Sequence, residues 1–262
     1  MTLVWCTGAG KGIGRAVVKR LVQDGARVAA SARTRADLES LASETAGAAK
    51  PYPLDVTDEA AVRDAARAIE ADMGPLDLVI LNAGTHTPLT AARFDVATVR
   101  RIMETNFMGT VNPLAAVLPR FIERRRGHIA VVASIAGYRG LPSASAYGAS
   151  KSALITMCEA LKPELDHYGV KLTLINPGFV KTPLTDRNTF EMPFLMDVDA
   201  AARRIVAGLK SKRFEVTFPK RFTWGLKIAR CLPYSLYFAL TRGIGERLIE
   251  SETERSRPPS LP

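Results

Sequence analysis

The chain has 262 residues, 47% of them hydrophobic and 24% charged, which suits a globular core and excludes a disordered chain. Its three cysteines, Cys6, Cys158 and Cys231, lack CxxC spacing, which excludes a disulfide framework and a cysteine metal site. The net charge is +10, and from Lys210 onward eleven basic residues outnumber five acidic ones. With no secretory signal and no apolar run long enough to span a bilayer, the sequence predicts a soluble, cytoplasmic protein.

Short apolar runs alternate with helical patterns from the N-terminus to about residue 180. Strands are expected at residues 3–6, 27–31, 52–54, 78–81, 129–133 and 172–175. The intervening segments carry apolar residues at helical spacing, such as Val62, Ala66 and Ile69 after the N-cap Asp58. Continuous apolar strands between helices are typical of a parallel sheet buried on both faces. The sequence therefore predicts an α/β fold with one doubly wound Rossmann-type domain, its central parallel sheet flanked by helices.

The regular alternation is lost after Thr182. A helix over Asp199–Lys210 and a short strand over Phe214–Phe218 are expected next, and Pro233 should divide the following segment into two short helices. We predict a dinucleotide-binding and catalytic domain at 1–218 with a loop at about 183–199, a C-terminal helical extension at 219–257, and a disordered tail at 258–262.

A glycine-rich loop, TGAGKGIG over residues 7–14, follows the first predicted strand. Its glycines allow close approach of backbone to a pyrophosphate at the start of the next helix. The spacing departs from GxGxxG by one residue, and it does not fit the P-loop because Lys11 precedes Gly12. A glycine-rich turn without a ligand is the alternative.

Polar or glycine residues also follow the other predicted strands, at the edge where open parallel sheets bind ligands. They are Ala32-Arg33, Asp55-Val56, Asn82-Ala83-Gly84, Ser134 and Asn176-Pro177-Gly178. Each alone can be a cap or turn residue. Together they predict a binding site along this edge.

Ser134, Tyr147 and Lys151 form the sharpest pattern. Tyr147 and Lys151 are four residues apart on the inward stripe of a predicted helix, where a lysine is costly unless it has a partner or a function. An ammonium beside a phenol favours the phenolate, which makes tyrosine a usable acid or base. Ser134 ends the fifth strand and can hydrogen-bond a carbonyl oxygen. The alternative is an amphipathic core tyrosine with a lysine that reaches the surface.

The motifs between Thr7 and Thr182, about two-thirds of the chain, resemble those of single-domain short-chain dehydrogenases/reductases. The resemblance implies that Tyr147 exchanges the proton at the substrate oxygen, Ser134 orients the carbonyl, and Lys151 binds the nicotinamide ribose. It implies that Asn106 holds a proton-relay water, although Asn106 can also be a polar helix residue bonded to backbone. The residues implied to bind cofactor are Gly8, Gly10, Lys11, Gly12, Ile13, Gly14, Asp55, Val56, Asn82, Ala83, Gly84, Tyr147, Lys151, Pro177, Gly178, Val180 and Thr182.

Cofactor preference is predicted from the end of the second strand. NAD-binding folds place a carboxylate there to bind the ribose 2′-OH. This chain has Arg33 instead, with Arg35 nearby and Lys11 in the glycine loop, which favours the 2′-phosphate of NADP over NAD. Solvation of the next helix start by Arg33 and Arg35 is the alternative.

The predicted function is an NADP(H)-dependent oxidoreductase that interconverts a carbonyl and a secondary alcohol. The alternative is a non-catalytic dinucleotide-binding protein with a regulatory or interaction role. No metal site is expected, since His86, His128 and His167 lack ligand spacing. No nucleic-acid partner is expected, since the sequence shows no aromatic platform on a strand face and no recognisable binding motif. The resemblance implies a homo-oligomer, a dimer or tetramer, paired through the helices that contain Asn106 and Tyr147.

Two segments rich in apolar residues allow predictions about the substrate and about contact with a membrane. The 183–199 loop, the usual site of substrate selection in the family, carries Leu184, Phe190, Met192, Phe194, Leu195 and Met196, which favour a hydrophobic substrate. Residues 220–242 mix aromatic and basic side chains and are predicted to cap the substrate pocket. Packing of this segment on the core or on a subunit is favoured over weak peripheral contact with a membrane.

Overall fold

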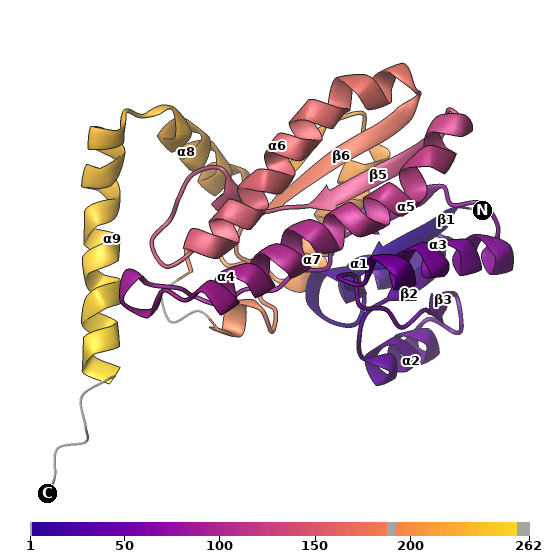
Figure 1. Ribbon diagram of the computed structural model, residues 1–262, viewed down its shortest axis with the longest axis horizontal. Coiled ribbons are helices and arrows are strands. Elements are labelled where there is room, and N and C mark those ends of the chain that lie inside the picture. Colours follow the sequence, from indigo (N-terminus) through magenta and orange to yellow (C-terminus); the bar gives the residue numbers. More distant parts are fainter. Residues whose placement is uncertain (1, 188–191, 256–262) are drawn as a thin grey trace, which may run out of the picture.

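The computed structural model describes residues 2–187 and 192–255, and within them seven parallel strands form one sheet (Figure 1). The strands are β1 (Leu3–Thr7), β2 (Arg27–Ser31), β3 (Ala49–Pro51), β4 (Leu78–Leu81), β5 (Gly127–Val132), β6 (Val170–Pro177) and β7 (Glu215–Phe218). Their order across the sheet is β3-β2-β1-β4-β5-β6-β7. The predicted doubly wound α/β fold is confirmed.

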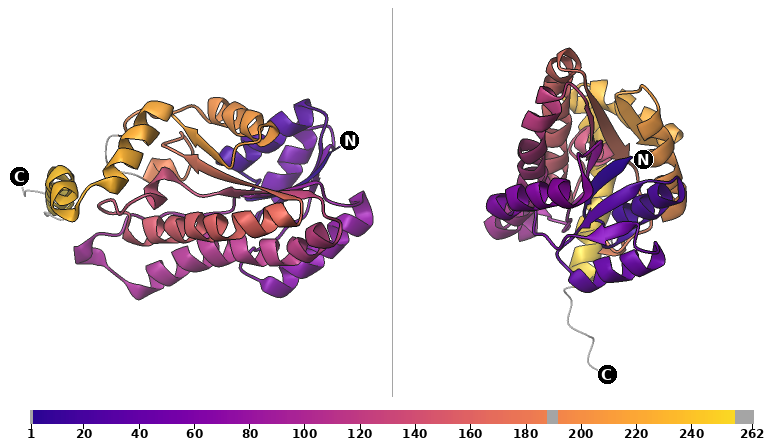
Figure 2. Two further views of the ribbon diagram at one scale, coloured as in Figure 1. Left: turned by 90° about the horizontal axis from the view of Figure 1, so that it is seen from above. Right: turned by 90° about the vertical axis from the view of Figure 1, so that its right-hand side faces the viewer.

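Helices cover both faces of the sheet (Figures 1 and 2). They are α1 (Gly12–Gln23), α2 (Arg35–Glu44), α3 (Glu59–Met73), α4 (Val96–Met103), α5 (Gly109–Glu123), α6 (Ser145–His167), α7 (Val198–Lys210), α8 (Lys220–Cys231) and α9 (Tyr234–Arg255). The first two helices and α7 enclose one core cluster, and α3, α5 and α6 enclose the other. Side chains alternate between these clusters along β1, where Trp5 belongs to one and Cys6 to the other.

One predicted strand lies elsewhere. The third strand was expected at residues 52–54, whereas β3 occupies Ala49–Pro51, where Ala49 pairs with Val28 of β2. The residues of β3 are Ala49, Lys50 and Pro51, which do not form an apolar run, and Tyr52 and Leu54 instead continue as loop toward the sheet edge. The expected break at Pro233 is observed, because it separates α8 from α9, but the second helix is not short, since α9 has 22 residues. Residues 258–262 and Phe190, to which the sequence analysis also assigned roles, lie outside the described residues.

The strand order reverses between β1 and β4, because the chain moves outward to β3 before it returns to β4. In open parallel sheets, a crevice forms at the carboxyl ends of the strands at such a point. The glycine-rich loop after β1 and the segments after β2 and β4 meet there. The fold therefore places the predicted binding residues at one edge.

Candidate active site

A cleft of about 450 Å³ opens at this edge. It contains most of the residues predicted to bind a cofactor, namely Gly8, Gly10, Lys11, Gly12, Ile13, Arg33, Asp55, Val56, Asn82, Ala83, Gly84 and Thr182. It also contains residues that the sequence analysis did not assign to the cofactor, among them Asp37, Leu54, Thr85 and Thr105. Thr85 and Thr105 are the sequence neighbours of Gly84 and Asn106, which were predicted as site residues. That position next to predicted site residues could have indicated that the two threonines also line the cleft.

The glycine loop has a backbone that only glycine adopts easily. Gly8 and Gly12 have φ angles of +66° and +55°. Gly14 does not line the cleft: a Cβ there would lie 2.2 Å from the carbonyl oxygen of Gly8, so its role is to let α1 pack under the loop. Lys11, the N-cap of α1, makes no side-chain capping bond. The N–H groups at this helix start suit a phosphate group.

The Asn82 side chain supports the loop from behind. Its Nδ2 atom donates to the carbonyl oxygens of Thr7 and Gly8 at 3.2 and 3.1 Å, while its backbone N–H donates to Thr7 Oγ1 at 3.0 Å. The amide of Asn82 therefore ties β4 to the glycine loop and holds the shape of the cleft.

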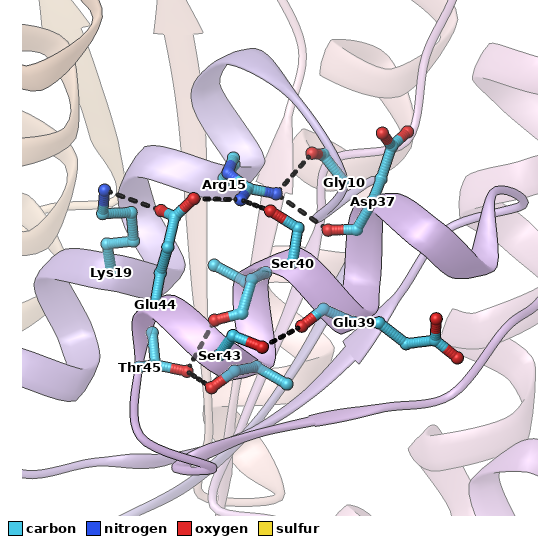
Figure 3. A network of polar contacts seen from close by, with 11 residues as sticks. Gly10, Arg15, Lys19, Asp37, Glu39, Ser40, Ser43, Glu44 and Thr45 are labelled. Carbon is cyan, nitrogen blue, oxygen red and sulfur yellow. Dashed lines mark hydrogen bonds and ion pairs between the residues drawn. The ribbon is translucent and has the colours of Figure 1, made fainter.

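A second polar network fixes the opposite side of the loop (Figure 3). Arg15 of α1 donates to the carbonyl oxygens of Gly10 and Asp37 at 3.1 and 2.8 Å, and to Ser40 Oγ at 2.9 Å. It also forms an ion pair with Glu44 at 2.6 Å. This arginine thereby locks the start and end of α2 against the glycine loop.

Charged residues gather where the cleft passes the end of β2. Lys11 and Asp37 form an ion pair at 3.4 Å, and the exposed Arg33 lines the same part of the cleft. Arg35 is absent from the cleft lining and instead lies 3.9 Å from Glu39. Of the two arginines considered, only Arg33 is placed to contact a group in this cleft.

Asp55 occupies the neighbouring wall. Its Oδ1 accepts hydrogen bonds from the backbone N–H and the hydroxyl of Thr57, at 3.0 and 2.8 Å. Partial burial opposes ionisation, but these bonds and the charge of Arg33 outweigh it, so the pKa of Asp55 lies below its ordinary value. This carboxylate is therefore ionised at neutral pH and fixed in the turn.

Ser134, Tyr147 and Lys151 come together beyond β5 and on the first turns of α6. The Nζ atom of Lys151 lies 5.8 Å from the centroid of the Tyr147 ring and donates to the carbonyl oxygen of Val132 at 3.0 Å. Tyr147 is hydrogen-bonded with Ser134. A Cβ on Gly137 would lie 2.7 Å from the backbone of Lys151, so this glycine lets the Ser134 turn pack closely on α6.

Burial sets the protonation of this group. Burial raises the pKa of Tyr147 above 10, and the hydrogen bond with Ser134 offsets part of that rise. The direction is opposite to the lowering expected from a lysine neighbour. Burial also lowers the pKa of Lys151 from 10.5 to about 8. At neutral pH, Tyr147 is therefore a neutral phenol and most Lys151 side chains carry a proton.

Asn106 joins this group from a π-helical turn between α4 and α5, a local widening that often marks functional sites. Its Oδ1 accepts from the N–H of Thr85 at 2.7 Å, and its Nδ2 donates to Thr85 O and Ser150 Oγ at 3.0 and 2.9 Å. A Cβ on Gly84 would lie 3.4 Å from Asn106 Oδ1 and 3.6 Å from Lys151 Nζ. Asn106 thus connects the β4 loop to α6 beside the lysine.

His86 is a neighbour that the sequence analysis did not assign to the site. Its ring is buried and packs edge-on against Tyr147, with 4.7 Å between ring centroids. The histidine lies two residues after Gly84, close enough in sequence to have drawn attention. It forms one wall around the phenol.

Three predicted residues support the cleft from outside its lining. Pro177 ends β6, Gly178 donates its N–H to the carbonyl oxygen of Phe218 at 2.7 Å, and Val180 is buried beside Met196. They anchor the segment that carries Thr182 into the cleft. The structure does not place Pro177, Gly178 or Val180 in direct contact with the cleft.

An aromatic cluster stands beside this segment. Phe222 of α8 stacks on Phe179 with 5.9 Å between centroids and contacts Phe194 of the 183–199 loop at 5.8 Å. Phe194 is 57% exposed. The C-terminal extension thus contacts the loop that was expected to select the substrate.

The family model for short chain dehydrogenases matches residues 2–192. The chain belongs to the short-chain dehydrogenase family. This short-chain dehydrogenase is 41% identical over 239 residues to a Myxococcus xanthus (strain DK1622) protein named as an uncharacterized oxidoreductase, covering 90% of this chain and 94% of that one. A Staphylococcus epidermidis protein with the same kind of name is 33% identical, covering 70% of this chain and 80% of that one. The chain is therefore an oxidoreductase of this family.

Solved structures agree with the family. A short chain dehydrogenase from Burkholderia cenocepacia J2315, in complex with NADP, has a TM-score of 0.80 at 27% identity and covers 92% of this dehydrogenase and 97% of that chain. A 3-ketoacyl-(acyl-carrier-protein) reductase from Brucella melitensis, complexed with NADH, has a TM-score of 0.77 at 27% identity. The match covers 83% of this dehydrogenase and 96% of that chain. The family resemblance expected from the sequence motifs is confirmed.

Proposed function

We propose that this dehydrogenase uses NADP(H) to interconvert a carbonyl group and a secondary alcohol on a hydrophobic substrate. The observation that carries the proposal is the meeting of Ser134, Tyr147 and Lys151 beside the cleft of about 450 Å³ at the strand ends. Asn106 adjoins them through Gly84. A protein that used the fold only to bind a partner would not require a buried, costly lysine next to a half-buried phenol.

The cleft residues fit a dinucleotide. The uncapped start of α1 and the glycines under it suit the pyrophosphate, and Asp55 and Val56, which line the cleft, are the residues that we assign to the adenine. Solved relatives bind NADP or NADH. Lys11 and Arg33 outweigh Asp37 in charge at the end of β2, which favours a 2′-phosphate there.

In the reducing direction, Tyr147 donates its phenolic proton to the carbonyl oxygen, and its raised pKa keeps that proton available at neutral pH. The Ser134 hydroxyl orients and polarises the same oxygen by a hydrogen bond. The Lys151 ammonium binds the nicotinamide ribose and stabilises the phenolate that remains after proton transfer. Asn106 holds the position of the water that returns a proton toward Lys151. NADPH, when bound, supplies the hydride that reduces the carbonyl carbon.

The proposed substrate is hydrophobic because apolar side chains border the site. Leu184 lines the cleft, and Phe179, Phe194 and Phe222 form the adjoining cluster. In this proposal α8 closes the pocket through Phe222. Assembly into a dimer or tetramer through the helices that contain Asn106 and Tyr147 stays a prediction.

The test is turnover of a panel of aliphatic, steroid-like and acyl carbonyls with NADPH and NADH, followed by the loss of reduced-cofactor absorbance. Tyr147→Phe should bind NADPH within about twofold of wild type yet lose at least roughly 100-fold in turnover, since one proton carrier is removed. Tyr168→Phe, at the far end of the same helix, is the matched control and should stay active. Full activity of Tyr147→Phe would refute the acid–base assignment. Tight NADPH binding without turnover of any carbonyl would support a non-catalytic role.

A further inference from the structure

Exposed apolar side chains are concentrated in the two C-terminal helices. Of the twelve large apolar residues that are exposed in the described part of the chain, seven lie between positions 224 and 244. They are Trp224, Ile228, Tyr234, Leu236, Phe238, Leu240 and Ile244, which are 45–73% exposed. Scattered exposed apolar residues are normal in a soluble protein, but a continuous group marks a surface that binds something.

Helix α8 packs on the rest of the molecule with one side and leaves two of its large apolar residues exposed. On the inner side, Thr223 is buried and bonded to Thr217 at 2.8 Å, and Lys227 forms an ion pair with Glu215. The next residue after Thr223 and after Lys227, namely Trp224 and Ile228, is 66% and 64% exposed, and the two lie one helical turn apart on the same stripe. Phe222 and Leu226 of the same helix pack against the core cluster, so α8 is attached through its inner side while Trp224 and Ile228 stay exposed.

Helix α9 is attached to the rest of the molecule by its first turn. Tyr237 is buried and donates its hydroxyl to the carbonyl oxygen of Gly140, while the guanidinium of Arg139 lies 4.0 Å from the Tyr237 ring centroid. Beyond that turn the helix projects away from the sheet and its covering helices (Figures 1 and 2). Leu240 and Ile244 continue the stripe of Tyr237 but are exposed.

The charge of this surface has one sign. Residues 220–242 contain five basic residues and no acidic one. Lys227 is neutralised by Glu215, whereas Lys220, Arg221, Arg230 and Arg242 have no carboxylate within ion-pair distance among the residues that the structure describes. The apolar surface is thus surrounded by unpaired positive charge.

This combination decides between two possible occupants. A second copy of the chain would bring a surface of the same charge against this one, which is repulsive. A lipid surface that contains anionic headgroups offers negative charge to the lysines and arginines and an apolar interior to Trp224 and its neighbours. None of the helices in the described part of the chain has the length and hydrophobicity needed to span a bilayer. We propose that α8 and the first half of α9 dock the enzyme onto the surface of an anionic lipid bilayer.

Tryptophan fluorescence of the full chain tests this proposal directly. The protein has two tryptophans, and Trp5 is fully buried in the core, so a change in emission on adding vesicles reports Trp224. We expect a blue shift with phosphatidylcholine vesicles that contain 30% phosphatidylglycerol, and quenching of the emission by brominated acyl chains. Vesicles of phosphatidylcholine alone should give at least tenfold weaker binding. Raising the salt from low to physiological concentration should weaken binding to the anionic vesicles.

Co-sedimentation of variants with the same vesicles separates the contributions. Arg221→Glu with Arg230→Glu should lower vesicle partitioning more than tenfold, because each cation near such a surface contributes about a fivefold factor. Lys212→Glu with Arg213→Glu changes the net charge equally outside the surface and should leave partitioning within about twofold. Ile228→Ser should also weaken binding.

Two results would overturn the proposal. One is the absence of any emission shift or sedimentation with anionic vesicles at low salt. The other is a blue shift that needs no vesicles, grows with protein concentration and disappears in Ile228→Ser, because it would identify a second copy as the occupant. Neither readout depends on turnover, so failure of this proposal is distinguishable from failure of the proposed reaction.

Discussion

Replacing Lys151 by methionine should abolish activity and yet stabilise the folded protein near neutral pH. The side chain is 4% exposed, and burial lowers its pKa from 10.5 to about 8. One pKa unit corresponds to about 1.36 kcal/mol, so holding the buried ammonium costs the folded state roughly 3 kcal/mol at pH 7. Methionine has a similar length and carries no charge.

The lost hydrogen bond of Lys151 reduces this gain in stability, and the pH changes its size. The carbonyl oxygen of Val132 loses the hydrogen bond that Lys151 Nζ donates at 3.0 Å, which costs about 1 kcal/mol. Between pH 8 and 10.5 the folded state binds fewer protons at this lysine than the unfolded state does, so wild-type stability rises with pH through that window. The advantage of the variant should therefore be roughly 2 kcal/mol at pH 7 and about 1 kcal/mol at pH 9.

Urea unfolding of Lys151→Met and wild type without cofactor, at both pH values, measures the difference. Lys212→Met, at an exposed position, is the control and should stay within about 0.5 kcal/mol of wild type at either pH. A variant that is less stable than wild type at pH 7, or whose advantage does not shrink at pH 9, would refute the argument that a desolvated ammonium strains this site.

Three further outcomes are expected. Arg33→Asp should shift the ratio of NADPH to NADH affinity toward NADH by about tenfold or more, whereas Arg35→Asp, outside the cleft, should leave it nearly unchanged; fluorescence titration of both cofactors measures this ratio. Gly14→Ala should lower the free energy of unfolding by about 1–3 kcal/mol because its Cβ would overlap a carbonyl of the glycine loop, while Gly243→Ala, in open space, should not. Phe222→Ala should raise KM for a hydrophobic carbonyl with little change in cofactor affinity, and unchanged KM would mean that α8 does not border the substrate.

The sequence allowed the sheet to be predicted because its strands are continuous apolar runs. The same reasoning misplaced β3, since the segment Ala49–Pro51, with one alanine, a lysine and a proline, pairs with β2 without forming an apolar run of its own. The bounds of such a short edge strand depend on the strand with which it pairs. This pairing is set by tertiary structure and is not visible in the local sequence.

The sequence predicted those site residues that directly follow a strand or lie at the start of the next helix. Ser134 follows β5 and Lys151 lies on α6, the next helix along the chain, so both were expected at the carboxyl edge of the sheet where ligands bind. The raised pKa of Tyr147 was not predicted, since the burial that raises it arises only when the chain is folded. The carboxylate of Asp37 in the cleft was missed because it lies on a helix, beyond the strand end.

The C-terminal helices are tied to the segment that connects Ser134 with Tyr147. Glu215 accepts hydrogen bonds from Tyr138 and Asn176 while it pairs with Lys227 of α8. Half-burial opposes ionisation of this carboxylate, but the three partners outweigh it and lower its pKa, so the link persists at neutral pH. Because the next residue of that segment, Arg139, binds the carbonyl oxygens at the end of α8, the surface proposed to contact lipid and the turn that carries the reactive hydroxyl share one rigid support.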